Sequence, residues 1–176
     1  DTKFLTYKAD LLKLLSLVKN DYFVQEVSDR RISHYRTTYW DDDAHRFYVM
    51  HQNGHRTRLK VRVRTYEDSD GLTFLEIKRK DNKGKTHKKR TKVKNQTEIA
   101  ESGGDKFLIS HTGIELQTLH PCLQNRFKRI TLVNKGMTER LTIDFDIEYN
   151  NFETLNRACS NRLVIIELKR DGMACS

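Results

Sequence analysis

Apolar and charged positions alternate along several stretches of this chain, which is the pattern of a β-strand with one buried and one polar face. The clearest case is the run Arg58-Leu59-Lys60-Val61-Arg62-Val63-Arg64, where every second residue is a cation. The four cations therefore share one face of a strand, and the aliphatic residues between them share the other. Like charges along one face repel each other, so a structural role alone explains them poorly. A bound polyanion would relieve this repulsion.

The same reading predicts further strands and a few short helices. Helical spacing of Leu11, Leu12, Leu15 and Val18 predicts a helix over 9–19. The acidic run 41–43 is typical of a helix start, because carboxylates cap the first turn and meet the helix dipole favourably. Other strands are expected over 1–7, 33–40, 56–66, 72–80, 85–94, 127–133, 140–149 and 163–169, with short helices between 97 and 119 and over 152–158.

Such a succession of strands predicts an α+β protein whose core is an antiparallel β-barrel of about eight strands, with short helices as plugs. A length of 176 residues indicates a single domain over 1–176. Hydrophobic residues make up only 36% of the chain and charged residues 32%, which is lean for a solid apolar core. A barrel with a polar interior would reconcile this composition with a folded domain.

The excess positive charge is concentrated in one stretch. Residues 55–94 carry a net charge of +10, whereas the rest of the chain carries −1, so this stretch accounts for the formal +9 of the whole. Such an excess of basic residues is typical of a protein that binds a nucleic acid, a polyphosphate, a nucleotide or an anionic membrane surface.

The three cysteines are widely spaced and form no metal-binding motif, which is typical of reduced thiols in a cytoplasmic protein. No apolar run approaches the ~20 residues that a membrane-spanning helix needs, so no membrane span is expected. The seven histidines also show no ligand spacing, although His87 could contact phosphate beside Lys85 and Lys89.

Several expected strands carry charge on one face. Single alternating strands are usually solvated, but the repetition argues for a shared purpose. If these faces converge inside a barrel, they form a water-filled tunnel. In such a tunnel, arginine and lysine would bind phosphate oxygens, and the carboxylates would hold a divalent metal. Such a tunnel suits phosphoryl transfer, which depends on positioning and on neutralising charge. The faces group Arg62 with Arg64, Glu76 with Lys78, Lys85 with His87 and Lys89, Arg140 with Thr142 and Asp144, and Glu167 with Lys169.

A set of short motifs occurs in a fixed order along the chain: Asp1-Thr2-Lys3-Phe4, Tyr39-Trp40-Asp41, the stretch 60–66, Leu75-Glu76-Ile77-Lys78, the stretch 84–90 and Ile166-Glu167-Leu168-Lys169. This ordered set resembles the VTC domain, the catalytic domain of the vacuolar transporter chaperone complex and its bacterial relatives, and the bacterial type is the better match. The resemblance implies a triphosphate tunnel metalloenzyme, of a CYTH-like superfamily whose antiparallel strands form a tunnel. The family normally continues into a C-terminal helix, which is expected to be missing from this chain.

The resemblance implies a polyphosphate polymerase that transfers the γ-phosphate of ATP to a growing chain with Mn²⁺ or Mg²⁺. It also implies site residues. Glu167 would be the metal ligand, and the strand faces add Glu76 and Asp144 as further candidates. Lys169 is expected to face inward beside Glu167, and Lys60 and His87 are added as phosphate ligands from the strand faces. The phosphate-binding or catalytic cations would be Lys3, Arg62, Arg64, Lys78, Lys89, Arg129 and Arg140.

Two alternatives stay open. An inorganic or nucleoside triphosphatase would use the same tunnel with water as the acceptor. A non-catalytic module would bind polyphosphate, inositol phosphate or RNA, but such a module has no use for Glu167 among cations. RNA is disfavoured because aliphatic rather than aromatic residues separate the cations of residues 58–64. The sequence does not show whether a membrane protein is a partner.

Overall fold

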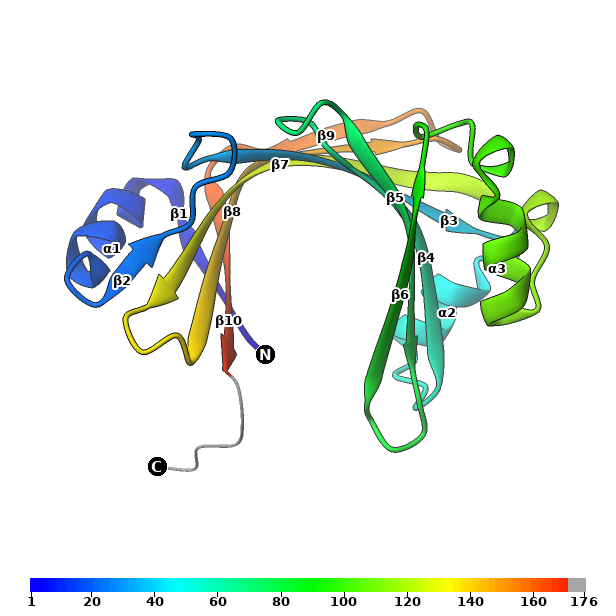
Figure 1. The fold of residues 1–176 in the computed structure, drawn as a ribbon, viewed down its shortest axis with the longest axis horizontal. Helices are drawn as coiled ribbons and strands as arrows, with labels where there is room; N and C mark the ends of the chain where they lie inside the picture. The colour runs from blue at the N-terminus through cyan, green and yellow to red at the C-terminus, as the bar shows by residue number, and fades with distance from the viewer. Residues whose placement is uncertain (171–176) are drawn as a thin grey trace. The chain divides into compact units, whose positions relative to one another are not determined.

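The computed structural model describes residues 1–170, and its main feature is a ten-stranded sheet (Figure 1). Hydrogen-bonded neighbours follow the order β1-β10-β8-β7-β3-β4-β5-β6, with β2 beside β7 and β9 beside β8. Within residues 1–170, no strand pairing joins β1 to β6, so the closed barrel stays a prediction. The strands are β1 (Thr2–Tyr7), β2 (Tyr22–Val24), β3 (Ser33–Asp41), β4 (Arg58–Tyr66), β5 (Leu72–Lys80), β6 (Thr86–Val93), β7 (His120–Asn134), β8 (Glu139–Asn151), β9 (Arg157–Ser160) and β10 (Leu163–Arg170).

In the part of the chain that the structure describes, three α-helices and three short 3-10 helices accompany the sheet. They are α1 (Leu11–Val18), α2 (Arg46–Gln52) and α3 (Gly104–Thr112), with 3-10 turns at Lys8–Asp10, Ala100–Ser102 and Leu116–Thr118. The residues group into two compact units, and the single domain over 1–176 stays a prediction. The first unit consists of Asp1–Tyr35, Arg126–Glu148 and the segment from Ala158 onward, and the second of Arg36–Asn125 and Tyr149–Arg157.

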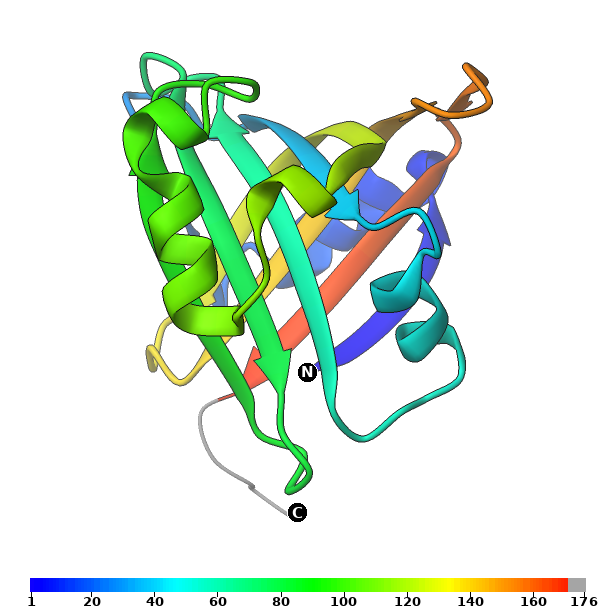
Figure 2. The same cartoon turned by 90° about the vertical axis from the view of Figure 1, so that its right-hand side faces the viewer.

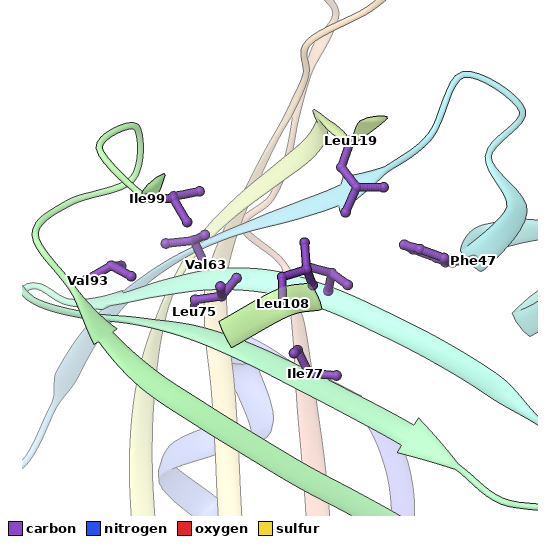
Figure 3. Packing of buried hydrophobic residues seen from close by; sticks show 9 residues of the cluster. Phe47, Val63, Leu75, Ile77, Val93, Ile99, Leu108 and Leu119 are labelled. Carbon is purple, nitrogen blue, oxygen red and sulfur yellow. The ribbon is translucent and has the colours of Figure 1, made fainter. Parts of the chain in front are cut away.

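The core of the second unit lies between the hairpin strands β4–β6 and helix α3. Figure 2 shows α3 lying in front of these strands and running along them. Figure 3 shows Leu108 of α3 among Val63, Leu75 and Ile77, and all four residues are at most 3% exposed. The aliphatic residues of the alternating strand thus pack against a helix, which leaves the cations on the opposite face. Strand β4 therefore has the two-faced character that its sequence predicts.

Helix α3 begins at a pair of glycines, Gly103 and Gly104. Gly103 has φ 75°, a left-handed conformation that favours glycine. A Cβ on the next residue, Gly104, would lie 2.5 Å from the Ile99 side chain and 2.7 Å from its carbonyl oxygen. The second glycine is therefore required by close packing against Ile99, which is itself buried in the core.

The core of the first unit forms between helix α1 and one face of the sheet. Leu11 is buried, and Leu14, Leu15 and Val18 pack against the same cluster. The helical spacing predicted Leu11, Leu15 and Val18 on this face, but Leu12, which it grouped with them, is 78% exposed. The sheet contributes buried apolar residues from β7, β8 and β10, namely Ile130, Leu132, Ile143, Phe145, Val164 and Ile166.

The helix predicted over 152–158 is wrong. The side chain of Asn151 accepts hydrogen bonds from the backbone N–H groups of Glu153 and Thr154, at 2.9 and 3.0 Å. The N–H of Phe152 donates to the carbonyl oxygen of Cys122 at 3.0 Å. These bonds form a turn instead of a helix, and the chain continues into β9. The sequence reading also missed β2 and placed the start of β7 too late.

Within the residues that the structure describes, no helix is long and apolar enough to cross a membrane.

Candidate functional site: cation rows on two polar sheet faces

The polar face of β4–β6 carries cations in cross-strand rows. The strand register places Lys60 opposite Lys78 and Lys78 opposite Lys88, so three lysines form one row. The next row contains Arg62, Glu76 and Arg90. Like charges directly opposite one another destabilise a sheet, so this arrangement has an electrostatic cost in the absence of an anion. The flanking rows add Arg58 with Lys80 and Thr86, and Arg64 with Phe74 and Lys92.

Glu76 is a carboxylate that holds these rows together. Its side chain is fully buried and lies 2.6 Å from Nη2 of Arg62 and 2.6 Å from Nζ of Lys88. Burial alone would raise its pKa, but the two cations outweigh it and lower the pKa to about 2. Both oxygens are thus engaged by cations. Glu76 was a candidate metal ligand from sequence, and the structure instead places it in an ion-pair network.

Lys78 lies at the centre of the three-lysine row. Burial, together with the charges of Arg62, Lys88 and Arg64, lowers its pKa to about 8. Its ammonium charge is therefore destabilised by the surroundings and would be favoured by an added anion. This is the electrostatic behaviour expected of a residue poised to bind phosphate.

Two arginines on this face are held by neighbouring side chains. Arg64 donates from Nε to Oγ1 of Thr37 at 3.0 Å. The guanidinium of Arg90 stacks over the ring of Phe74 at 4.7 Å from the ring centroid. Such contacts orient a guanidinium before a ligand arrives, which reduces the entropy lost on binding.

Lys89 and His87 are on the other face, contrary to expectation. The register pairs Lys89 with Ile77 and His87 with Arg79, so neither residue shares the face of Arg62. Nε2 of His87 lies 3.0 Å from Asp81 in the hairpin turn. Lys88 and Arg90 occupy the positions that the sequence reading gave to Lys89. The sequence did contain a signal for this assignment, because residues opposite each other in an antiparallel hairpin share a face. In this hairpin the even-numbered residues of β6 lie opposite the even-numbered residues of β5, on the face of Arg62.

The first unit has a polar face of its own, on β1, β10 and β8. Lys3 lies opposite Glu167, and Glu167 lies opposite Thr142. Lys169 is opposite Arg140, and its Nζ is 3.9 Å from Glu167, which is beyond a direct hydrogen bond. The Glu167 side chain is 22% exposed. The structure thus places the predicted face of Glu167 and Lys169 beside that of Arg140 and Thr142, with Lys3 on the adjoining strand.

Arg129 and Asp144 form a bidentate pair in the same unit. Nε and Nη2 of Arg129 donate to the two carboxylate oxygens at 2.5 and 2.6 Å. Burial would lower the pKa of Arg129, but the hydrogen bonds and charge of Asp144 raise it. The guanidinium also lies near the stacked rings of Tyr35 and Phe127. Because Arg129 occupies both oxygens of Asp144, Glu167 is the better placed metal ligand of the two.

An antiparallel sheet that presents rows of cations, with a few carboxylates among them, defines a class of proteins built to bind phosphate-rich anions. The VTC domain model matches residues 1–174, and the chain therefore belongs to the VTC domain family. A comparison with curated protein sequences gives no match.

Several solved structures share the fold at low sequence identity. A proposed adenylate cyclase from Bacillus halodurans has a TM-score of 0.58 and 13% identity, covering 94% of this chain and 77% of that one. A proposed adenylate cyclase from Vibrio parahaemolyticus has a TM-score of 0.54 and 9% identity, covering 98% and 77%. A protein from Hippeastrum, described as having a dominant triphosphatase activity, has a TM-score of 0.53 and 10% identity, covering 93% and 76%.

Proposed function

We propose that this protein is a polyphosphate polymerase, which transfers the γ-phosphate of ATP to the end of a growing polyphosphate chain. Membership of the VTC domain family supports the class of enzyme. The observation that carries the proposal is the set of parallel cation rows on β4–β6, centred on Lys60, Lys78 and Lys88. Successive rows suit successive phosphates better than they suit a single phosphate group.

In this proposal the cation rows bind the phosphate oxygens and hold the acceptor for attack. A terminal oxygen of the acceptor chain forms a new bond to the γ-phosphorus. The bond from this phosphorus to the β,γ-bridging oxygen breaks, and ADP leaves with the electron pair. Lys60, Arg64, Lys78 and Arg90 neutralise the charge on the transferring group, which is the main requirement of phosphoryl transfer. Arg62 contributes while it remains paired with Glu76.

A divalent ion, Mn²⁺ or Mg²⁺, is part of the proposal. Glu167 offers the hard oxygen that such ions prefer, and it sits among Lys3, Lys169 and Arg140 rather than in a closed ion pair. The ion would supply charge neutralisation at phosphate oxygens. Lys3 and Arg140 keep the phosphate-binding role that the family resemblance gives them, and Lys169 joins them as a phosphate ligand because it lies opposite Arg140. Arg129 is proposed to act while paired with Asp144.

A triphosphatase is the second candidate, and the fold shared with the Hippeastrum protein favours it. The two reactions differ only in the acceptor, which is a phosphate chain in one and water in the other. A cytoplasmic location is proposed for either enzyme, since ATP is available there and the thiols of Cys122 and Cys159 are unpaired.

The test is to incubate the protein with ATP and Mn²⁺ and to measure ADP, free phosphate and long-chain polyphosphate. Polyphosphate in proportion to ADP supports the polymerase, whereas free phosphate alone supports the triphosphatase. Lys60→Gln should reduce turnover at least tenfold. Lys89→Gln removes the same charge from the opposite face and should leave turnover within twofold, so equal losses in both variants would contradict the assignment of the face.

A further inference from the structure

A cavity of about 530 Å³ in the second unit is lined by an unusual set of side chains. His45, Cys122 and Glu153 all contribute to its wall, together with the aromatic rings of Tyr39 and Trp40. None of the three has a part in the phosphate chemistry proposed above. They come from three separate segments: the turn before α2, strand β7 and the turn after β8.

The potential donor atoms of these three residues converge. One ligand atom from each residue lies within 4.8 Å of the other two. Nε2 of His45 is 3.2 Å from Oε2 of Glu153. Ligand atoms around a tetrahedral zinc ion are separated by roughly 3.3–3.8 Å, as bonds of about 2.0–2.3 Å require. Small side-chain rotations would therefore bring all three atoms to bonding distance of one ion.

The backbone holds each residue in place from its own segment. His45 has φ 50°, and the turn that carries it is fixed by Asp42, whose carboxylate accepts from the N–H groups of Ala44 and Arg46 at 3.1 Å each. Cys122 is tied to the loop after β8 by the hydrogen bond from the N–H of Phe152. The turn centred on Asn151 fixes Glu153. The convergence therefore does not depend on long flexible side chains alone.

A second layer of residues orients the carboxylate. Nε2 of His120 lies 3.2 Å from Oε1 of Glu153, while its Nδ1 lies 3.3 Å from Asp43. One carboxylate oxygen is thus directed to His45 and the other to His120. Histidine–carboxylate contacts of this kind support the ligands of zinc sites and fix their orientation.

We propose that His45, Cys122 and Glu153 bind a zinc ion, with His120 and Asp43 as supporting residues. Nitrogen, sulfur and carboxylate donors together favour zinc over Mg²⁺ or Mn²⁺, which prefer oxygen ligands alone. Three protein ligands leave the fourth tetrahedral position to a water molecule in the cavity. Lys60 lines the same cavity, so this zinc site borders the cation rows of β4–β6. The site is separate from the divalent ion proposed at Glu167.

Titration with Co²⁺, followed by visible and near-ultraviolet absorption, tests the site without any measurement of activity. The 176-residue chain with Cys159→Ser and Cys175→Ser serves as the parent, so that Cys122 is the single remaining thiol of this chain. We expect one equivalent of Co²⁺ to give intense tetrahedral d–d bands and a thiolate-to-cobalt charge-transfer band. Zn²⁺ should then displace the cobalt and bleach both features.

Variants separate zinc binding from a simple network of hydrogen bonds. Cys122→Ser should remove the charge-transfer band, and Glu153→Gln should weaken Co²⁺ binding while leaving that band in place at saturation. His120→Gln should weaken binding about 10- to 100-fold, as expected for a supporting residue. Circular dichroism would verify that each variant is folded. Weak octahedral spectra in the folded parent, or a charge-transfer band that Cys122→Ser leaves unchanged, would overturn the proposal.

Discussion

At the scale of single residues, the cation rows depend on the buried pair of Arg62 and Glu76. The Glu76 side chain is 0% exposed and that of Arg62 is 9% exposed, so each would be costly to bury alone. Lys88 shares the same carboxylate from the next strand. One carboxylate thus connects three strands, and its loss would leave two cations without their partner.

Replacing Glu76 with glutamine should therefore destabilise the fold by about 3 kcal/mol, because it leaves Arg62 buried and uncompensated. The pKa of Glu76 is lowered from 4.5 to about 2, so its contribution is fully present above pH 4.5 and is lost as the pH falls towards 2. Urea unfolding of both proteins between pH 2 and pH 7 measures this. A difference in unfolding free energy that does not shrink with falling pH would contradict the ion-pair interpretation.

Charged Lys78 should destabilise the folded protein, whereas charged Glu76 stabilises it. Its pKa is lowered from 10.5 to about 8, so the unfolded chain binds more protons than the folded one between these values and stability rises with pH in that window. Lys78→Met should consequently stabilise the empty protein at pH 7 by on the order of 1 kcal/mol, a figure reduced for solvent screening. Thermal unfolding at pH 7 and pH 10 tests this, and an equal stability difference at both would argue against it.

At the scale of the elements, the hairpin from β5 to β6 decides which cations serve the site. Lys80 pairs with Thr86, and this register places residues 88, 90 and 92 on the face of Arg62. The turn residue Asp81 fixes the register, since its carboxylate accepts from the N–H groups of Lys83 and Lys85 at 2.9 Å each. A shift by one residue would exchange the two faces of β6.

Two neighbouring residues of β6 give a direct test of this register. Arg90→Gln should weaken tripolyphosphate binding about tenfold, the equivalent of one charge-assisted hydrogen bond of about 1.4 kcal/mol. Lys89→Gln removes the same charge one position earlier and should change affinity less than twofold. Isothermal titration calorimetry at constant ionic strength measures both, and a larger effect at Lys89 would reject the assigned face.

Sequence patterns predicted some of these elements well and others poorly. Alternation predicted the two faces of β4, and helical spacing predicted α1 and most of its buried face, because each pattern is local. Leu12 is the exception, because it is exposed while Leu14 packs on the core. Helix α2 begins at Arg46, later than the acidic run at 41–43 predicted, although Asp41 does accept hydrogen bonds from the N–H groups of Phe47 and Tyr48 in its first turn. The turn at Asn151 was missed because its bonds depend on a side chain and on a partner strand.

The same distinction applies to the candidate site. Arg62, Arg64, Lys60 and Lys78 were found from a pattern within single strands. The place of Lys88 and Arg90 depends on pairing between strands, which the choice of Lys89 did not take into account. The grouping of His45, Cys122 and Glu153 has no sequence signal, because the three residues are brought together only by the fold.

At the scale of the whole molecule, the charge distribution destabilises the protein when no anion is bound. The chain has a formal net charge of +9 and a pI near 9.5, with the excess in residues 55–94 that form β4–β6. These strands also contain the rows in which lysines lie opposite lysines. A polyanion would remove this repulsion, so binding and folding should be strongly coupled.

Tripolyphosphate should accordingly raise the melting temperature, by an amount that corresponds to about 2.7 kcal/mol at one hundred times its dissociation constant. The effect should decline with added salt, because exposed charges are screened. Differential scanning fluorimetry at 0.05 and 0.5 M KCl measures it, with inorganic sulfate as a control anion. An unchanged melting temperature at low salt would contradict the polyanion site.

The row of Lys60, Lys78 and Lys88 has a consequence for the lifetime of the protein. A fold that is weakened by its own empty site opens more often, and proteases cleave the open form. Molecules without a bound phosphate chain would then be degraded sooner than loaded ones. The abundance of the protein would follow the supply of its ligand, without any dedicated regulator, through the mutual repulsion of three lysines.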